Sequence, residues 1–553
     1  MTAAAPAHVT PPDARRAASL LLLRDGAAGL EVLMLRRAER DGDLRSGAAV
    51  FPGGVLDPRD RDAHAFCTGG DDAAFSARMG LPEGGLDYAV AALRECFEEV
   101  GLLLAEGEFD LGALQPWRHR LNDGQASLAE LCASFGLTLP VDRLVYYSHW
   151  LTPPGVPKRF DTRFFAAPAP VGQQALADLG EALELMWLTP AAALDPARGL
   201  KLLPVTRRTL EELSRHADAA SALAAARERR DIRVTMPRLG RAGGKPRIVL
   251  PDELPWAEIG RLDPEGRGDV AAELRPGVPV RLSAHVIRVT APNPGPMTGP
   301  GTNSYLVGAG EGEAGSWTVI DPGPAIDAHV QALLAAAPGR ITRILVTHTH
   351  RDHSPAAAAL AAATGAPLWG RVADHPEWQD GGFVPAHAPQ HGERFDAAPG
   401  VVLRTVHTPG HASNHLCYLL EHERLLFTGD HVMQGSTVVI NPPDGDMAAY
   451  LRSLAALLDE DLQWLAPGHG FLVAEPQAVL RALIAHRLKR EAKVAAALQR
   501  LGPAPLAALL PAVYDDVPAA LHPAAARSLT AHLLKLQAEG RAAEQGGHWQ
   551  ALR

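Results

Sequence analysis

Residues 344–360 read ILVTHTHRDHSPAAAAL, an apolar strand-like run that ends in side chains able to bind metal ions. Four such side chains fall within six residues, namely His348, His350, Asp352 and His353. Side chains two positions apart on an extended segment point to the same side, so His348 and His350 are predicted to share one metal ion. A helix is expected just beyond this run, and the turn into it would carry Asp352 and His353 toward a second ion.

Three later segments each place one more metal-binding side chain directly after an apolar strand. These are His411 in HTPGHASNH, Asp430 in LLFTGDH and His469 in LAPGHG. Each lies beside a glycine, which permits a tight turn at the end of the strand. A single capping aspartate or loop histidine would be ordinary, but seven ligand-type side chains in this order predict one shared metal centre.

This arrangement resembles the metallo-β-lactamase superfamily, whose T-H-x-H-x-D-H motif matches residues 347–353, within a similarity that covers about residues 280–475. The resemblance implies an αββα sandwich that holds two Zn²⁺ or other divalent transition-metal ions. It assigns His348, His350 and His411 to one ion, Asp352, His353 and His469 to the other, and Asp430 to the bridge, with Asp352 also a candidate catalytic residue. Two cations about 3.5 to 4 Å apart would lower the pKa of a shared water and favour hydrolysis.

Features around the motif resemble the β-lactamase-like endoribonucleases that carry a winged helix. They are the loop APNPGPMTGPGTNSYLVG at 291–308, the segment GDHVMQGSTVV at 429–439 and the tail AEGRAAEQGGHWQAL at 538–552. The candidates for the substrate mouth are Asn303, Ser304, Ser436 and Thr437, although such residues beside glycine are also ordinary turn formers. His415, four residues after His411, is expected to carry a proton or to support a ligand, with a purely structural role as the alternative.

A long Ala-rich helix is predicted over residues 476–500, and its charges bear on the substrate. It carries six basic residues and one acidic residue, namely Arg481, Arg487, Lys489, Arg490, Lys493, Arg500 and Glu491. Clusters of lysine and arginine bind phosphates, so this helix favours an RNA-like phosphodiester substrate. A solvated charged face on a packed helix is the alternative interpretation.

A second motif lies in the N-terminal half, where residues 92–104 read ALRECFEEVGLLL. Glu95, Glu98 and Glu99 fall on one helical face, and Arg94 can pair with Glu98; a solvated salt-bridge face is the common interpretation of such charges. The string R-E-x-x-E-E-x-G, with GAAVFPGGVLDPRD upstream at 47–60, resembles a Nudix box. The resemblance implies an αβα sandwich in which the three glutamates hold Mg²⁺ or Mn²⁺. Glu95 and Glu98 are then catalytic candidates, and Arg94 is a candidate substrate contact.

An insertion splits this box. The standard pattern G-x5-E-x7-R-E separates glycine from arginine by fourteen residues, whereas Gly54 and Arg94 are forty apart, an insertion of twenty-six. The position eight before Arg94 holds Leu86, so the acid that normally fixes the catalytic helix is predicted to be missing or displaced, with Glu83 and Asp87 nearby. The insertion resembles that of the peroxisomal coenzyme-A-diphosphatase type of Nudix protein. This similarity implies hydrolysis of a nucleoside diphosphate linked to another moiety.

The composition indicates a globular chain with several domains. The chain has 553 residues, of which 47% are hydrophobic and 21% charged, and a formal net charge of −10. This balance opposes indiscriminate binding to nucleic acids or membranes, while a local basic patch stays compatible with it. The four cysteines form no C-x-x-C pair, and no apolar run reaches the length that spans a bilayer. We therefore expect reduced thiols, a cytoplasmic location and no membrane partner, and leave homodimerisation open.

The whole pattern predicts an α/β and α+β multidomain protein. The expected parts are a Nudix-like domain at 13–235, a Pro/Gly-rich linker at 236–278, a metallo-β-lactamase-fold domain at 279–475, and a basic helix with a winged-helix domain at 476–553. The leading hypothesis is a metal-dependent hydrolase of an RNA-like phosphodiester, fused to a diphosphate hydrolase. One alternative is a hydrolase of small-molecule thioesters, glyoxalase-II-like or acyl-CoA-specific, with a coenzyme-A-type Nudix partner. Another makes the Nudix half a non-catalytic ligand-binding module.

Overall fold

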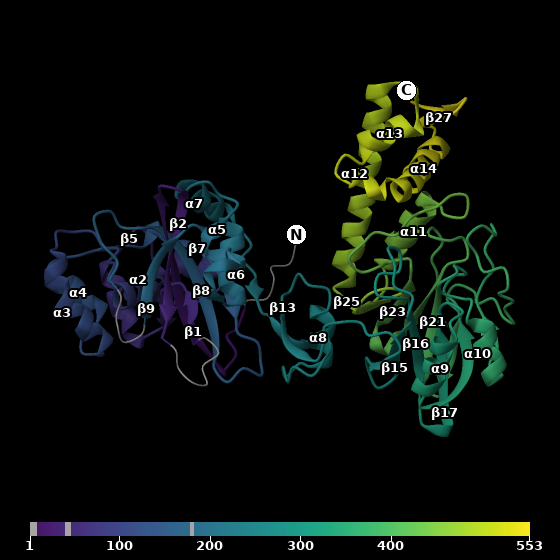
Figure 1. The fold of residues 1–553 in the computed structure, drawn as a ribbon, viewed down its shortest axis with the longest axis horizontal. Helices are drawn as coiled ribbons and strands as arrows, with labels where there is room; N and C mark the ends of the chain where they lie inside the picture. The colour runs from purple at the N-terminus through teal and green to yellow at the C-terminus, as the bar shows by residue number, and fades with distance from the viewer. Residues whose placement is uncertain (1–7, 39–45, 177–181, 553) are drawn as a thin grey trace. The chain divides into compact units, whose positions relative to one another are not determined.

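The computed structural model describes residues 8–38, 46–176 and 182–552, which fall into two compact units. Unit 1 comprises Met1–Leu239 and Glu265–Gly268, and unit 2 comprises Gly240–Pro264 and Asp269–Arg553. Figure 1 colours the chain from purple in unit 1 to yellow at the end of unit 2. No helix among the described residues has both the length and the apolar character needed to cross a bilayer.

Unit 1 is built on a mixed sheet in the order β10-β3-β2-β1-β8-β7-β11, with β4 beside β1 and β9 beside β2. Its first two strands, β1 (Ala14–Gly26) and β2 (Gly29–Arg37), form an antiparallel hairpin. Successive residues 17–23 of β1 are all buried, so both faces of the sheet are covered, as helix-covered layers require. Helix α2 (Gly85–Val100), which carries the predicted glutamates, packs against β1, β4 and β8. This is the expected Nudix layering.

The other strands of unit 1 are β3 (Ala48–Val50), β4 (Gly53–Val55), β5 (Cys67–Thr68), β6 (Leu139–Pro140), β7 (Val145–Leu151), β8 (Arg159–Pro168), β9 (Ala182–Leu188), β10 (Lys201–Leu202) and β11 (Val234–Thr235). Its other helices include the 3-10 helix η1 (Pro58–Phe66) and α1 (Asp72–Met79), α3 (Leu111–Asn122), α4 (Leu128–Phe135), α5 (Pro190–Leu194), α6 (Pro204–Leu213) and α7 (Ala219–Glu228). Most of η1, together with β5 and α1, lies between the two halves of the Nudix box. The insertion is therefore a folded part of the domain.

Unit 2 contains two six-stranded sheets in the part of the chain that the structure describes. The first consists of β14 (Val280–Arg281), β15 (Val286–Thr290), β16 (Asn303–Ala309), β17 (Gly312–Ile320), β18 (Gly339–Leu345) and β19 (Leu368–Trp369). The second consists of β20 (Arg394–Ala398), β21 (Val401–His407), β22 (Leu416–Leu420), β23 (Leu425–Gly429), β24 (Trp464–Pro467) and β25 (Val473–Ala474). Buried side chains of both sheets, including Tyr305, Tyr418 and Phe427, share one core.

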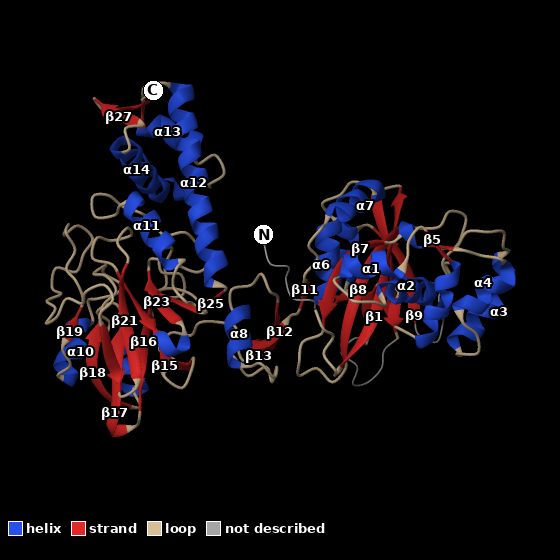
Figure 2. Ribbon diagram, turned by 180° about the vertical axis from the view of Figure 1, so that it is seen from behind, coloured by secondary structure: helices blue, strands red, loops and turns tan. Residues whose placement is uncertain are grey.

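Helices cover the outer face of each sheet (Figure 2). Helices α9 (Asp327–Ala336) and α10 (Ala357–Thr364) share a core with the first sheet. Helices α11 (Met447–Leu457) and α12 (Pro476–Leu501) share one with the second. The order helix, sheet, sheet, helix confirms the predicted αββα sandwich.

The C-terminal end of α12 enters a separate small core with the tail. This part consists of β26 (Ala504–Pro505), α13 (Leu506–Val513), α14 (His522–Ala538), β27 (Ala542–Gln545) and β28 (His548–Ala551). Gly546 and Gly547, both with positive φ, turn β27 into β28, and Trp549 packs on Val494 and Leu498 of α12 within one cluster. The predicted winged-helix domain is confirmed.

The segment expected to be a linker, residues 236–278, is partly folded. It contains β12 (Arg238–Ala242), β13 (Lys245–Val249) and α8 (Trp256–Leu262). Both Glu258 oxygens of α8 accept hydrogen bonds from buried Arg288 on β15, at 2.6 and 2.8 Å. A bidentate ion pair away from water fixes α8 to the first sheet of unit 2, which the polar composition of the segment did not indicate.

Candidate functional site

Four strand ends at one edge of the paired sheets carry the seven predicted ligands. The chain passes from β18 into the segment with His348 and His350, and from β21 into the loop with His411. Asp430 directly follows β23, and His469 stands two residues after β24. Because each side chain lies just past a strand that is held in register by its neighbours, the fold brings together residues that are far apart in sequence.

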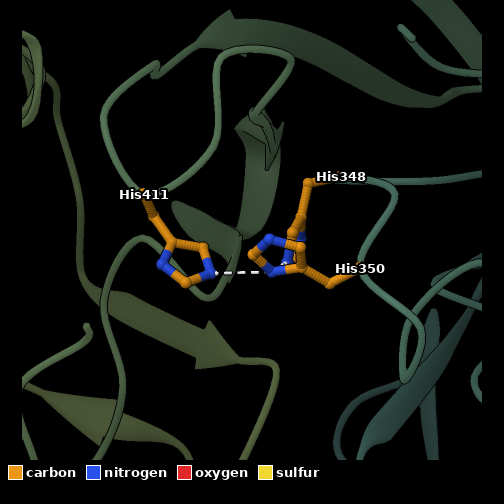
Figure 3. A group of neighbouring side chains, drawn as sticks. All are labelled: His348, His350 and His411. Atoms are coloured by element: carbon orange, nitrogen blue, oxygen red, sulfur yellow. Dashed lines mark hydrogen bonds between the residues drawn. The ribbon is translucent and has the colours of Figure 1, made fainter. Parts of the chain in front are cut away.

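His348, His350 and His411 form the first ligand group (Figure 3). The Nε2 atoms of His348 and His411 lie 2.9 and 3.1 Å from the Nδ1 atom of His350. Burial and the neighbouring His411 imidazole lower the pKa of His350 to about 3, and burial also holds the pKa of His348 well below its usual value. Neutral imidazoles with converging lone pairs are the form that a metal ion binds.

Asp352, His353, Asp430 and His469 form the second group. Oδ1 of Asp430 lies 3.3 Å from Nε2 of both His353 and His469, and Oδ2 lies 3.7 Å from Nε2 of His411. The two oxygens of Asp430 therefore face different groups, which is the geometry the predicted bridge requires. Oδ2 of Asp352 lies 3.4 and 3.3 Å from the same two histidine nitrogens.

The inner atoms of this second group fit a bound cation. Nε2 of His353, Nε2 of His469 and Oδ1 of Asp430 are buried and have no hydrogen-bond partner among the described residues. Leaving such atoms without a partner in a protein interior is costly, and a divalent ion between them would remove that cost. The donor set of imidazoles and carboxylates without cysteine suits Zn²⁺ and related transition metals.

The outer nitrogens of four of the five ligand histidines have partners in the protein. The pairs are His348 Nδ1 with the Thr347 hydroxyl at 3.0 Å, His353 Nδ1 with Asp321 at 2.9 Å, His411 Nδ1 with the Val439 carbonyl at 2.8 Å and His469 Nδ1 with the Gly301 carbonyl at 3.2 Å. Such partners fix the ring orientation and the tautomer, so that the inner nitrogen faces the metal.

Asp321 is a supporting residue that the sequence analysis missed. It is buried, and its carboxylate also accepts bonds from the backbone N–H and hydroxyl of Thr347, at 2.7 and 2.8 Å. Its φ of 53° is unusual for a residue with a side chain, so the surrounding bonds must hold it there. The sequence feature that could have identified Asp321 is the Asp-Pro-Gly directly after the apolar strand WTVI at 317–320.

The candidate substrate residues lie in different environments. Asn303 is fully buried, and its amide nitrogen donates to the carbonyls of Pro467 and Gly470, at 3.1 and 2.8 Å. It therefore joins the start of β16 to the segment after β24, and its role at a substrate mouth remains a prediction. Ser304 is buried against His329, at 2.8 Å. Ser436 and Thr437 are exposed in the loop after Asp430, and their role remains a prediction.

His415 lies beneath the first ligand group. Its ring is 5.0 Å from that of His348, and its Nδ1 lies 2.9 Å from the hydroxyl of Thr408. Burial, reinforced by neighbouring His431, holds the pKa of His415 well below its usual value. This position fits support of the first ligand group, and the choice between support and proton transfer remains open.

In unit 1, Arg94 is the centre of a buried ion-pair network. Its Nε and Nη2 donate to the two oxygens of Asp60, at 2.7 and 3.2 Å, and Nη2 also donates to the Val55 carbonyl at 2.9 Å. Its Nη1 donates to Glu95 and Glu98, at 2.8 and 2.9 Å. Burial opposes the positive charge, but these partners outweigh it and raise the pKa of Arg94. All five donors are therefore engaged internally, and the role of Arg94 as a substrate contact remains a prediction.

Asp60 is the acid that the sequence analysis described as missing or displaced. It is buried, and it stands six residues after Gly54, which is the standard G-x5-acid spacing with aspartate in place of glutamate. The insertion therefore lies between Asp60 and Arg94, and the ion pair between these two residues joins its two ends. Counting backward from Arg94 to Leu86 missed Asp60, whereas counting forward from Gly54 finds it.

The three glutamates of α2 do not converge into a tight group. Among the described residues, some sets of three or more ligand-type side chains have donor atoms within 4.8 Å of one another. The three glutamates belong to none of these sets. Glu99 accepts a bond from the backbone N–H of Gly53 at 2.8 Å. Burial, together with the nearby charge of Glu95, raises the pKa of Glu98 to about 7. Their metal-binding role remains a prediction.

His8, His149 and Asp161 form a third close set, which the sequence analysis did not single out. His8 lies 3.1 Å from Asp161, and His149 and Thr10 also bond to this carboxylate. Burial opposes the negative charge of Asp161, but the hydrogen bond from His149, with smaller contributions from Thr10 and Arg163, lowers the pKa of this carboxyl. The carboxylate is therefore already engaged by these neighbours in the absence of a metal ion.

Part of the positive charge on α12 is used inside unit 2. Arg487 is buried and donates to the Val438 carbonyl, while Arg490 donates to the Val513 carbonyl and to Asp516, at 2.6 and 2.7 Å. Lys493 pairs with Asp515 at 2.5 Å. The exposed basic residues of this helix are Arg481, Lys489 and Arg500.

Comparisons with known proteins agree with this geometry. Family models match in three places, as Metallo-beta-lactamase superfamily over residues 297–469, Beta-lactamase associated winged helix domain over 506–549, and NUDT19 Nudix domain over 72–202. The beta-lactamase-like protein 2 homolog of Drosophila melanogaster is 33% identical over 274 residues, which cover 47% of this chain and 90% of that protein. The chain therefore belongs to the metallo-β-lactamase superfamily. It is a hydrolase that carries a Nudix domain and a winged helix beside its lactamase-fold domain.

Two further similarities concern single parts of the chain. An atrochrysone carboxyl ACP thioesterase of Aspergillus chevalieri is 32% identical over 229 residues, covering 40% of this chain and 67% of that protein. A crystal structure of a Nudix hydrolase from Alicyclobacillus acidocaldarius aligns with 27% identity and a TM-score of 0.33, covering 38% of this chain and 96% of that one.

Proposed function

We propose that the lactamase-fold domain hydrolyses an acyl thioester and that the Nudix domain cleaves the diphosphate of a coenzyme-A-type carrier. The observation that carries the hydrolytic role is the pair of ligand groups joined by Asp430. Two divalent cations, with Zn²⁺ the expected pair, would supply Lewis acidity and an activated water at this edge of the sheets. The side chains of the protein hold the cations, and the partners of the outer nitrogens keep the imidazoles aimed inward.

The thioester preference is supported by two independent points. A relative named as an acyl-carrier-protein thioesterase aligns with the lactamase-fold region. In addition, Arg487, Arg490 and Lys493 are committed to partners within unit 2, which leaves fewer charges on α12 for phosphates. The resemblance of the split Nudix box to coenzyme-A diphosphatases supplies a second activity on the same class of molecule.

For the Nudix domain, we propose that Mg²⁺ or Mn²⁺ binds at Glu95, Glu98 and Glu99. Glu95 and Glu98 now neutralise Arg94, so cation binding requires these carboxylates to share their charge with the metal. The alternative of a non-catalytic module predicts no cation binding there. Titration of the full chain with Mg²⁺, compared with Glu98→Gln, separates the two.

The four cysteines are free thiols, which fits the proposed cytoplasmic location.

An RNA-like phosphodiester is the second candidate substrate, favoured by the winged helix and by the exposed Arg481, Lys489 and Arg500 on α12. A panel of acyl-CoA, acyl-glutathione, short single-stranded RNA and dinucleotides, tested with wild type, Asp430→Ala and Glu98→Gln, distinguishes the candidates. Thioester cleavage that Asp430→Ala abolishes supports the proposal. Cleavage of RNA alone, with a salt dependence that becomes shallower when the three exposed basic residues are neutralised, would replace it with the RNA function.

A further inference from the structure

Unit 1 contains a cavity of about 610 Å³ that the catalytic assignments do not use. Its walls come from residues 69–78 of the Nudix insertion, residues 142–146 at the start of β7, and residues 227–232 at the end of α7. Figure 2 labels α1, β7 and α7, which contain parts of these three stretches. None of the three glutamates of α2 lines this cavity, so it is separate from the candidate cation site.

The cavity gathers positive charge. Arg78, Arg227, Arg229 and Arg230 line it, together with a single carboxylate, Asp142. Arg229 is paired with Glu212 at 2.9 Å. The other three arginines are exposed and make no ion pair with the residues that the structure describes. The positive charges that line this cavity repel one another. A bound anion would be attracted to each of them and would offset this repulsion.

The rest of the wall is apolar. Phe75, Leu144, Val145 and Ile232 line the cavity beside the arginines. Guanidinium groups recognise phosphate oxygens by paired hydrogen bonds, whereas aromatic and aliphatic side chains take up a base or an acyl part. The volume lies within the range of cavities that hold small organic ligands, about 300 to 1,000 Å³.

The wall formed by α1 is also fixed in place. A Cβ added at Gly85, the first residue of α2, would lie 2.3 Å from the backbone N of Ser76 in α1. Such close backbone approach is available only to glycine, and it holds α1 against the helix that carries the glutamates. The insertion is thus a preformed wall of the cavity.

We propose that this cavity is an accessory binding site for an organic phosphate of the nucleoside diphosphate class, created by the insertion in the Nudix box. The phosphates face Arg78, Arg227 and Arg230, and the base lies on Phe75. The proposal does not depend on thioester hydrolysis, and it adds to the Nudix domain a binding site that is separate from the glutamates of α2, without assigning a new reaction.

The test is isothermal titration of the full chain with ADP, without added divalent metal. The triple variant Arg78→Gln/Arg227→Gln/Arg230→Gln should weaken ADP binding by at least about tenfold, because each substitution removes a charge-assisted hydrogen bond to the phosphates. The matched control Arg198→Gln/Arg207→Gln/Arg215→Gln removes the same charge from exposed positions in unit 1 that do not line the cavity, and should change the Kd by less than about twofold. Glu98→Gln should leave ADP binding unchanged.

The competing outcomes are distinct. Equal weakening in both triple variants would mean general attraction to a basic surface, and loss of binding in Glu98→Gln would place ADP at the glutamates; either result overturns the proposal. Adenosine binding as tightly as ADP would remove the role of the arginines. Pyrophosphate binding as tightly as ADP would remove the role of Phe75 and leave an inorganic phosphate site in place of the proposed one.

Discussion

At the scale of single residues, Asp430 joins the two halves of the metal centre. Its two oxygens face different ligand groups, so Asp430→Ala should lower the metal content of the purified protein from about two ions to less than one. Elemental analysis measures this directly. Asp327→Ala, a change at an exposed position of the same unit, is the control that should keep the full content. Retention of both ions in Asp430→Ala would contradict the bridge.

Asp60 is the residue on which the split Nudix box depends. Asp60→Ala leaves the buried charge of Arg94 without its main partner, and breaking such a pair costs about 3 to 5 kcal/mol. Hydrogen exchange measured on peptides from α2 should therefore become faster, because Arg94 ties this helix to η1. Asp62→Ala, at an exposed position two residues away, should leave the exchange unchanged. Unaltered protection of α2 in Asp60→Ala would show that the ion pair does not hold the helix.

The ligand residues could be predicted because each stands in a local pattern, an apolar strand followed by a glycine-containing turn. The supporting residues could not be identified equally well. A buried Asn303 and a turn-forming asparagine look the same in sequence, because the difference is whether strand ends from residues 467–470 lie beside it. Asp321 depends in the same way on Thr347 and His353, which another strand brings to it.

At the scale of elements, α12 shows that periodicity carries more information than charge counting. Buried positions recur along it at helical spacing, at Leu480, Arg487, Val494 and Leu498. The spacing places Arg487 in the apolar stripe, so its burial was predictable even though its charge suggested solvent or phosphate. The carbonyl that accepts its hydrogen bond could not be predicted, because Val438 lies in a loop that is distant in sequence.

Substitutions on α12 should therefore separate into two classes. Arg487→Gln should destabilise unit 2 by about 1 to 3 kcal/mol, since it leaves the buried Val438 carbonyl without its charged donor. Lys489→Gln, two residues away and exposed, should change stability by less than about 0.5 kcal/mol. Urea unfolding of the full chain compares them. Similar stabilities for the two variants would show that the buried arginine contributes no more than a surface charge.

At the scale of the whole molecule, the two compact units predict two independent active sites. Glu98→Gln should abolish diphosphate hydrolysis while the lactamase-fold activity stays within about twofold of wild type, because each unit has its own core. Asp430→Ala should have the reverse effect. Parallel rate measurements on both variants test this. A loss of both activities in either variant would mean that one site needs the other.

Helix α12 also has a mechanical consequence. Its 26 residues form one uninterrupted rod of about 39 Å, given a rise of about 1.5 Å per residue. One end is anchored in the core beside the second sheet through Leu480, and the other in the winged helix through Val494 and Leu498. The winged helix therefore cannot swing away unless the rod bends. The length of this rod therefore fixes the separation between the second sheet and the winged helix within unit 2.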